Sequence, residues 1–208
     1  MSKTLGWYTM MLGAVAIGAY AILQALLPGI RGSFVNDMIS ATPASASLHF
    51  LLGGVVIIVG ALQFHKGLRS SRPIVHRWMG RIYMVGVLLG GLAGLYLSFN
   101  SFGGLVTHFG FGMLAVLWLF TTGMAYQHIR AGNVRMHQQW MIRSYALTLG
   151  AVTLRIYLGF AVALGLDFEA AYQAISWLAW VPNLVIAEWL FVARFTASNA
   201  PTRMATVR

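Results

Sequence analysis

The sequence has no cysteine and very few acidic residues, and both absences narrow the chemistry open to it. Without cysteine there is no disulfide, no thiolate metal ligand, no iron–sulfur cluster and no cysteine nucleophile. Aspartate and glutamate together number four in 208 residues, and two of these, Asp167 and Glu169, lie in one short stretch. Any bound metal must therefore rely on histidine, methionine or oxygen ligands.

Motifs of soluble enzymes are missing as well. The sequence contains no HExxH zinc motif, no GxxxxGK[ST] phosphate-binding loop and no Ser-His-Asp spacing. Neither hydrolysis of a soluble substrate nor nucleotide-driven work is therefore indicated.

Charge is scarce along the whole chain. Only 9% of the residues are charged and 59% are hydrophobic, whereas a soluble domain carries roughly 25% charged residues. The formal net charge is +10, but the basic residues stand at the ends of apolar segments and not along one soluble face. This pattern indicates a lipid bilayer as partner and no nucleic acid.

Six apolar segments approach or exceed the roughly 20 residues that a membrane-spanning helix needs. Each is bounded by a helix breaker or a charge cluster, and they cover residues 5–27, 48–64, 76–97, 105–128, 137–164 and 171–195. We expect an all-α integral membrane protein with one domain over residues 1–208, because no linker divides it. The second to fifth helices are expected to form a four-helix bundle at about 48–164, with peripheral helices at about 5–27 and 171–195.

Basic residues concentrate on one side of these segments. The loop after the second segment holds Lys66, Arg69, Arg72, Arg77 and Arg81, whereas the loops on the opposite side hold almost no basic residues. The positive-inside rule therefore predicts a cytoplasmic location for this loop and for both termini, which carry Lys3, Arg194, Arg203 and Arg208. We expect a multi-pass protein of the bacterial cytoplasmic (inner) membrane.

A short motif occurs twice. Trp78-Met79-x-Arg81-x-Tyr83 recurs 62 residues later as Trp140-Met141-x-Arg143-x-Tyr145, each time shortly after a histidine. The second and third helices, and the fourth and fifth, are therefore interpreted as two related hairpins.

Four of the six histidines stand at helix starts, and ionisable groups at membrane depth are usually functional. His49 and His108 open the second and fourth helices on the outer side, while His76 and His137 open the third and fifth on the inner side. Diagonal helices of an antiparallel four-helix bundle run in the same direction, so this arrangement predicts one histidine pair in each leaflet. His65 and His128 lie in the cytoplasmic turns and are less suited as ligands.

Such pairs are what two bis-histidine haems require, since each iron takes axial imidazoles from facing helices. Glycine stands four residues after three of the four histidines, at Gly53, Gly80 and Gly112, where it leaves room for a flat macrocycle on the same helix face. The alternative is a non-redox protein, a small transporter or an assembly subunit, whose histidines bind protons or a metal ion. Small residues also serve helix packing alone, so both interpretations stay open.

A few other ionisable residues lie within the apolar segments. Arg77, Arg81 and Arg143 could neutralise the propionates of an inner haem or simply anchor the helix ends in the cytoplasmic interface. Arg155 lies deeper and could serve an outer haem. Glu188 follows a kink predicted at Pro182, and its depth requires a partner or a proton-linked role.

Several stretches resemble a bacterial family of predicted multi-pass membrane proteins without assigned chemistry. They are the glycine-rich helix that begins at His49, the sequence HRWMGRIY at 76–83, and MHQQWMIRSYALT at 136–148. The resemblance covers the second to fifth helices, about two-thirds of the chain.

More distantly, the order of histidines over four consecutive helices resembles the two-haem transmembrane cytochromes b, including ferric reductases. That resemblance implies two haem b groups per chain, with His49 and His108 ligating an outer haem and His76 and His137 an inner one. It also implies electron transfer from a cytoplasmic donor to an external acceptor such as ferric iron, an oxidised small molecule or a quinone. A homodimer, or a place as a subunit of a larger membrane complex, stays open.

Overall fold

The computed structural model describes residues 3–193, and these residues are helical almost throughout, with no strand among them. Six helical spans are long and apolar enough to cross a membrane, as the sequence predicted. They are α1 (Lys3–Leu26), α3 (Pro43–Gln63), α5 (Pro73–Ser98), α6 (Gly104–Arg130), α7 with α8 (Val134–Thr148 and Gly150–Ala163), and α9, α10 and π-helix η2 (Phe168–Leu178, Val181–Ala187 and Glu188–Val192). The predicted end of the last span at residue 195, and Arg194, Arg203 and Arg208, lie outside the described residues, as does the side chain of Lys3.

The histidines lie inside the helices and do not open them, which corrects the sequence-based boundaries. Proline occupies the first turn of both α3 and α5, where its missing N–H leaves no hydrogen bond unmade. These prolines start the helices at Pro43 and Pro73, ahead of His49 and His76. His49 is therefore the seventh residue of α3, and His76 is the fourth residue of α5.

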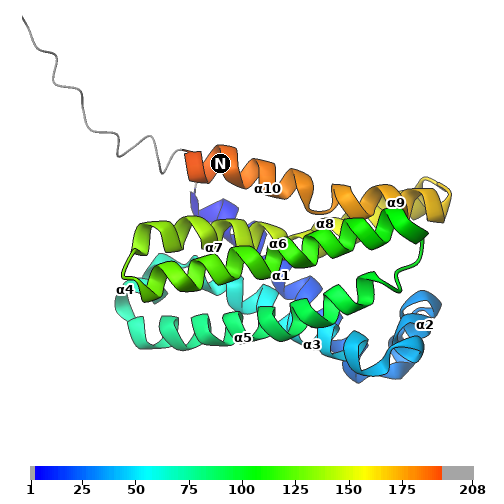
Figure 1. Ribbon diagram of the computed structural model, residues 1–208, viewed down its shortest axis with the longest axis horizontal. Helices are drawn as coiled ribbons and strands as arrows, with labels where there is room; N and C mark the ends of the chain where they lie inside the picture. The colour runs from blue at the N-terminus through cyan, green and yellow to red at the C-terminus, as the bar shows by residue number, and fades with distance from the viewer. Residues whose placement is uncertain (1–2, 194–208) are drawn as a thin grey trace, which may run out of the picture.

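A short amphipathic helix, α2 (Ser33–Ala41), was not predicted. It follows the single turn η1 (Pro28–Ile30) and lies at the end of the molecule opposite the short helix α4 (Lys66–Ser71) (Figure 1). We call the α2 end the outer end and the α4 end the inner end. Ile39 packs from α2 against a cluster that includes Phe50 of α3. The segment is too short to span a bilayer, so hydropathy alone predicts a loop at this position.

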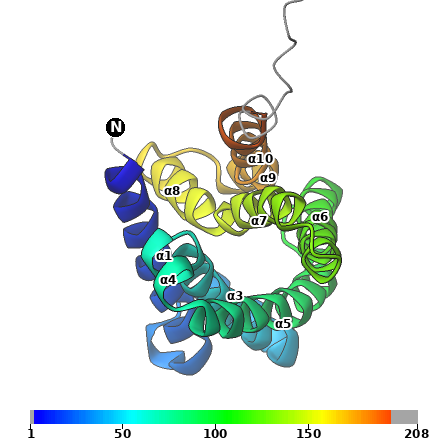
Figure 2. The ribbon, with the colours of Figure 1, turned by 90° about the vertical axis from the view of Figure 1, so that its left-hand side faces the viewer.

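The spanning helices are arranged around the axis of the molecule (Figure 2). α3 packs against α5, α5 against α6, and α6 against α7, and α7 also contacts α3. α1 lies along the outside of α3, while the α9 to η2 span lies along α6, α7 and α8. α1 also contacts α8, and α3, packed between α1 and α5, is the most enclosed of the six spans.

Hydroxyl and indole groups hydrogen-bond one another at mid-depth, where α5, α6 and α7 meet. The Tyr83 hydroxyl lies 2.8 Å from Ser144 Oγ and 2.9 Å from Thr148 Oγ1, and both partners are buried. Thr122 Oγ1 joins Ser144, and Trp118 Nε1 donates to Thr148. We call these five residues the central polar layer. It crosslinks three helices where the bilayer offers no water to satisfy polar groups.

The fifth span is broken at Leu149, between α7 and α8, whereas the sequence predicted one continuous helix. The break faces the Pro182 kink of the sixth span, which the sequence did predict. Thr153 Oγ1 donates to the Ala179 carbonyl and Asn183 Nδ2 donates to the Ala146 carbonyl. Side chains of each broken span thus satisfy carbonyl groups of the other, which allows two kinks side by side within the membrane.

Candidate functional site

His49 points from α3 toward the glycine-rich outer half of α5. Its Nδ1 donates a hydrogen bond to the Gly90 carbonyl oxygen at 2.9 Å, which leaves Nε2 as the unprotonated nitrogen. A Cβ on Gly94 would lie 2.8 Å from the ring, so any residue larger than glycine at position 94 would displace the imidazole. Gly53, one turn further along α3, has open space where a Cβ would stand. The imidazole is thus held by its Nδ1 side and packed against Gly94, and the open space lies one turn along α3 at Gly53.

His108 is held differently. Its Nε2 donates to the Ser101 carbonyl oxygen at 3.0 Å, in the loop between α5 and α6. That loop is stabilised by Thr107, whose Oγ1 donates to the Phe102 carbonyl. His108 would have to turn away from Ser101 before its Nε2 could bind an iron.

At the inner end, His137 repeats the arrangement of His49. Its Nδ1 donates to the Ala125 carbonyl oxygen of α6 at 2.8 Å, again leaving Nε2 unprotonated. His76 of α5 lies close enough to His137 for the two rings to interact electrostatically. His76 Nδ1 is buried and has no hydrogen-bond partner among the described residues. The structure therefore brings the predicted inner pair into one neighbourhood.

Gln63 belongs to the same inner neighbourhood and was missed by the sequence reasoning. Its Nε2 donates to the His76 carbonyl oxygen at 3.1 Å, while its Oε1 is buried without a partner among the described residues. A lone glutamine at the end of an apolar run was the available signal. Buried polar atoms without partners are costly, so two of them beside a histidine pair indicate room for a further polar group.

The central polar layer lies between the two histidine levels. Tyr83 follows His76 by about two turns of α5, and Ser144 follows His137 by about two turns of α7. On the outer side, Gly90 of α5 contacts His49. The fourteen residues from His76 to Gly90 rise about 21 Å along α5, so the two levels are well separated.

The duplicated sequence motif has matching local structure. The Arg81 guanidinium lies 4.6 Å from the centre of the Trp78 ring, and that of Arg143 lies 4.5 Å from the centre of the Trp140 ring. The two motif tyrosines are both buried and both approach Gly60 of α3. Matching contacts support the interpretation of the motif as a true repeat.

The predicted propionate partners differ in their surroundings. Arg81 is exposed and covers Trp78, which is also exposed. Such an exposed pair is typical of residues that anchor a helix in the membrane interface. Arg77 is exposed too. Arg155, in contrast, is only partly exposed, forms no ion pair within the described residues, and lies within electrostatic range of His49 and Tyr172.

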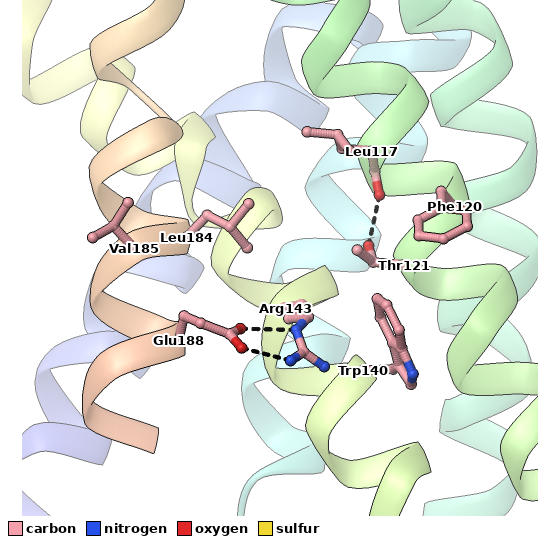
Figure 3. A pocket seen from close by; sticks show the side chains of 8 residues that line it. All are labelled: Leu117, Phe120, Thr121, Trp140, Arg143, Leu184, Val185 and Glu188. Carbon is pink, nitrogen blue, oxygen red and sulfur yellow. Dashed lines mark hydrogen bonds and ion pairs between the residues drawn. The ribbon is translucent and has the colours of Figure 1, made fainter. Parts of the chain in front are cut away.

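Arg143 has a carboxylate partner already. Its Nε and Nη2 donate to the two oxygens of Glu188 at 2.8 and 2.7 Å, in a bidentate ion pair (Figure 3). This pair supplies the partner that the sequence required for Glu188. It lies beside a groove of about 380 Å³ between α6, α7 and the α10–η2 segment, lined also by Leu117, Phe120, Thr121, Trp140, Leu184 and Val185.

His65 has a local structural role. Its Nδ1 accepts a hydrogen bond from the Leu68 backbone N–H and so caps α4, and its ring packs 4.9 Å from that of Trp7. Over residues 3–193, no three or more histidine and acidic side chains gather as they would around a metal ion. The candidate site therefore consists of two separate histidine levels and not of one cluster.

A family model described as "Predicted membrane protein (DUF2306)" matches residues 46–191, from α3 to η2. The match confirms the sequence resemblance to a family of predicted multi-pass membrane proteins, and extends it across the sixth span. No curated protein and no solved structure matches the chain.

Proposed function

The chain belongs to this DUF2306 family of predicted membrane proteins, and we propose that it is a di-haem cytochrome of b type that transfers electrons across the membrane. His49 and His108 would hold the outer haem, and His76 and His137 the inner one. The observation that carries the proposal is the shared state of His49 and His137. Each donates its Nδ1–H to a backbone carbonyl and keeps Nε2 free, as metal-ligating histidines do.

The side chains at each level fit this cofactor to different degrees. At the inner level, His76 and His137 lie within electrostatic range, and buried polar atoms of His76 and Gln63 have no partner among the described residues. At the outer level, Gly53 has open space where a Cβ would stand, whereas the His49 ring fills the space beside Gly94. His108 fits after rotation away from Ser101, which exchanges one hydrogen bond for a metal bond.

A haem supplies one-electron redox chemistry, and the protein supplies position and electrostatics. The carbonyl groups of Gly90 and Ala125 fix the tautomer and the orientation of two imidazoles. Arg155 provides positive charge near His49 that could offset an acidic propionate of the outer haem. The two levels would divide a membrane about 30 Å thick into two shorter steps.

We further propose that the protein lies in a bacterial cytoplasmic membrane with α4 on the cytoplasmic side. Its donor is then cytoplasmic, and its acceptor is external, such as ferric iron, an oxidised small molecule or a quinone, which makes it a membrane oxidoreductase. The absence of cysteine allows a clean test with Ser70→Cys in α4 and Asn100→Cys in the opposite loop, both at exposed positions. A membrane-impermeant maleimide should label Asn100→Cys in intact cells and Ser70→Cys only after permeabilisation, and the reverse pattern would invert the orientation.

The cofactor itself is tested by a reduced-minus-oxidised visible spectrum of the purified protein, with the haem content measured per chain. We expect low-spin b-type bands and two haems, with one haem retained in His49→Ala and one in His137→Ala. His65→Ala is the matched control, because His65 caps α4 and belongs to neither histidine level. This variant should keep both haems. A colourless protein after expression with ample haem would refute the proposal.

The inner level also favours a second candidate function. His76 Nδ1 and Gln63 Oε1 are buried without partners, and a proton-carrying water or a metal ion would satisfy them equally well. The protein would then be a non-redox transporter or assembly subunit. Haem-free protein that binds protons or zinc, and loses that binding in His76→Ala, would favour this alternative.

A further inference from the structure

The groove beside Arg143 and Glu188 is not part of either histidine level. It runs between α6, α7 and the α10–η2 segment, and its lining is apolar except for the ion pair, Thr121 and the Trp140 indole (Figure 3). Thr121 Oγ1 is occupied, because it donates to carbonyl oxygens of its own helix. The ion pair is therefore the polar end of an otherwise apolar groove.

The ion pair lies within the fifth and sixth candidate membrane spans. Arg143 follows the start of α7 at Val134 by nine residues, a rise of about 13 Å. Charges within a membrane span are costly and usually mark a functional position. The Arg143 side chain is 17% exposed and that of Glu188 is 48% exposed, so the carboxylate remains accessible from the groove.

The chemistry of the pair selects its ligand. Its two charges cancel, so an anionic lipid headgroup gains little from Arg143 and is repelled by Glu188. A purely apolar tail leaves the accessible carboxylate without a donor. A neutral ring that carries a hydroxyl group can, through that one group, accept from the guanidinium and donate to the carboxylate, and its apolar tail can fill the remaining groove.

We propose that this groove binds the head of a membrane quinol. Glu188 is also the first residue of π-helix η2, and single π-turns within α-helices are frequent at functional sites. His137 precedes Arg143 by six residues, about 9 Å along α7, so the bound ring lies near the inner histidine level.

The redox role of this site rests on the proposed function, in which the donor is on the cytoplasmic side. Oxidation of a quinol breaks two O–H bonds and releases two electrons and two protons. The proposed haems, once bound in the ferric state, would accept the two electrons. Glu188 accepts one proton, and water at the cytoplasmic edge accepts the other.

The binding test uses the full-length protein in lipid nanodiscs and decylubiquinol, kept reduced, as the probe, with quenching of tryptophan fluorescence as the readout. Glu188→Gln should weaken binding about tenfold or more, as expected for loss of a charge-assisted hydrogen bond from the quinol hydroxyl. Leu184→Phe narrows the groove without removing the ion pair or adding a tryptophan, and should also weaken binding. Glu169→Gln, an acid at the start of α9, is the matched control and should bind as the unmodified protein does.

Size-exclusion profiles establish that each variant is folded. The inference is overturned if the unmodified protein does not bind decylubiquinol, or if both groove variants bind it as well as the control does. It is also overturned if added phosphatidylglycerol displaces the quinol, because the occupant is then a lipid headgroup. A haem spectrum without quinol binding removes only this inference, whereas quinol binding by a colourless protein removes the redox role and the proposed function but retains the site.

Discussion

Tyr83→Phe is expected to destabilise the protein by removing one atom from the central polar layer. The Tyr83 side chain is 0% exposed, and phenylalanine retains its shape, so the change tests hydrogen bonding and not packing. The hydroxyl bonds Ser144 and Thr148. Hydrogen bonds between membrane helices contribute about 0.6 kcal/mol on average, and those in soluble proteins about 1 kcal/mol. Loss of two should therefore lower the free energy of unfolding by about 1–2 kcal/mol.

The smaller end of that range is favoured, because both partners retain other bonds. Ser144 keeps Thr122, and Thr148 keeps the indole of Trp118. The assay is equilibrium unfolding in mixed micelles, with helix content as the signal. Tyr96→Phe is the matched control on the same helix, since Tyr96 is 56% exposed, and should lie within about 0.5 kcal/mol of the unmodified protein.

Equal stabilities of Tyr83→Phe and Tyr96→Phe would refute this account of the layer. A double-mutant cycle with Ser144→Ala sharpens the test, because residues in one hydrogen-bond network should couple by about 0.5 kcal/mol or more. Purely additive effects would mean that the two side chains stabilise the fold independently.

Two glycine substitutions test the histidine level and the core separately. Gly94→Ala would place a Cβ 2.8 Å from the His49 ring, so the imidazole must move; we expect the haem content to fall from two to about one per chain, and an unchanged content would contradict the assigned outer site. Gly60→Ala would drive a Cβ into the Tyr145 ring and should destabilise the fold by about 1–3 kcal/mol, measured by the same unfolding assay. Gly123→Ala, with open space around its Cβ, is the control for both and should preserve haem content and stability.

Much of the fold could be predicted from the sequence for a simple physical reason. A bilayer requires about 20 apolar residues in each helix, and this length requirement is visible in composition alone. Six such segments gave six spans, and the Pro182 kink followed from the geometry of proline. The duplicated Trp-x-x-Arg-x-Tyr motif likewise predicted a repeat, which the matching contacts of Arg81 and Arg143 support.

The sequence did not reveal where the helices truly start or break. α2 is shorter than any membrane span, so its amphipathic pattern went unnoticed beside the long apolar segments. The break at Leu149 has no proline to mark it. It depends on Thr153 and Asn183, which meet carbonyl groups across two separate spans, and such contacts exist only after the helices have packed.

By itself, the sequence determined the membrane environment and the number of spans, because both follow from hydrophobic length. Tertiary structure alone decided which nitrogen of each imidazole forms a hydrogen bond to the backbone. It also decided that Gln63 contacts His76 and that Arg143 forms an ion pair with Glu188. These depend on how neighbouring helices are rotated about their axes. Rotation is set by packing between residues far apart in the chain, and a linear pattern of apolar residues does not record it.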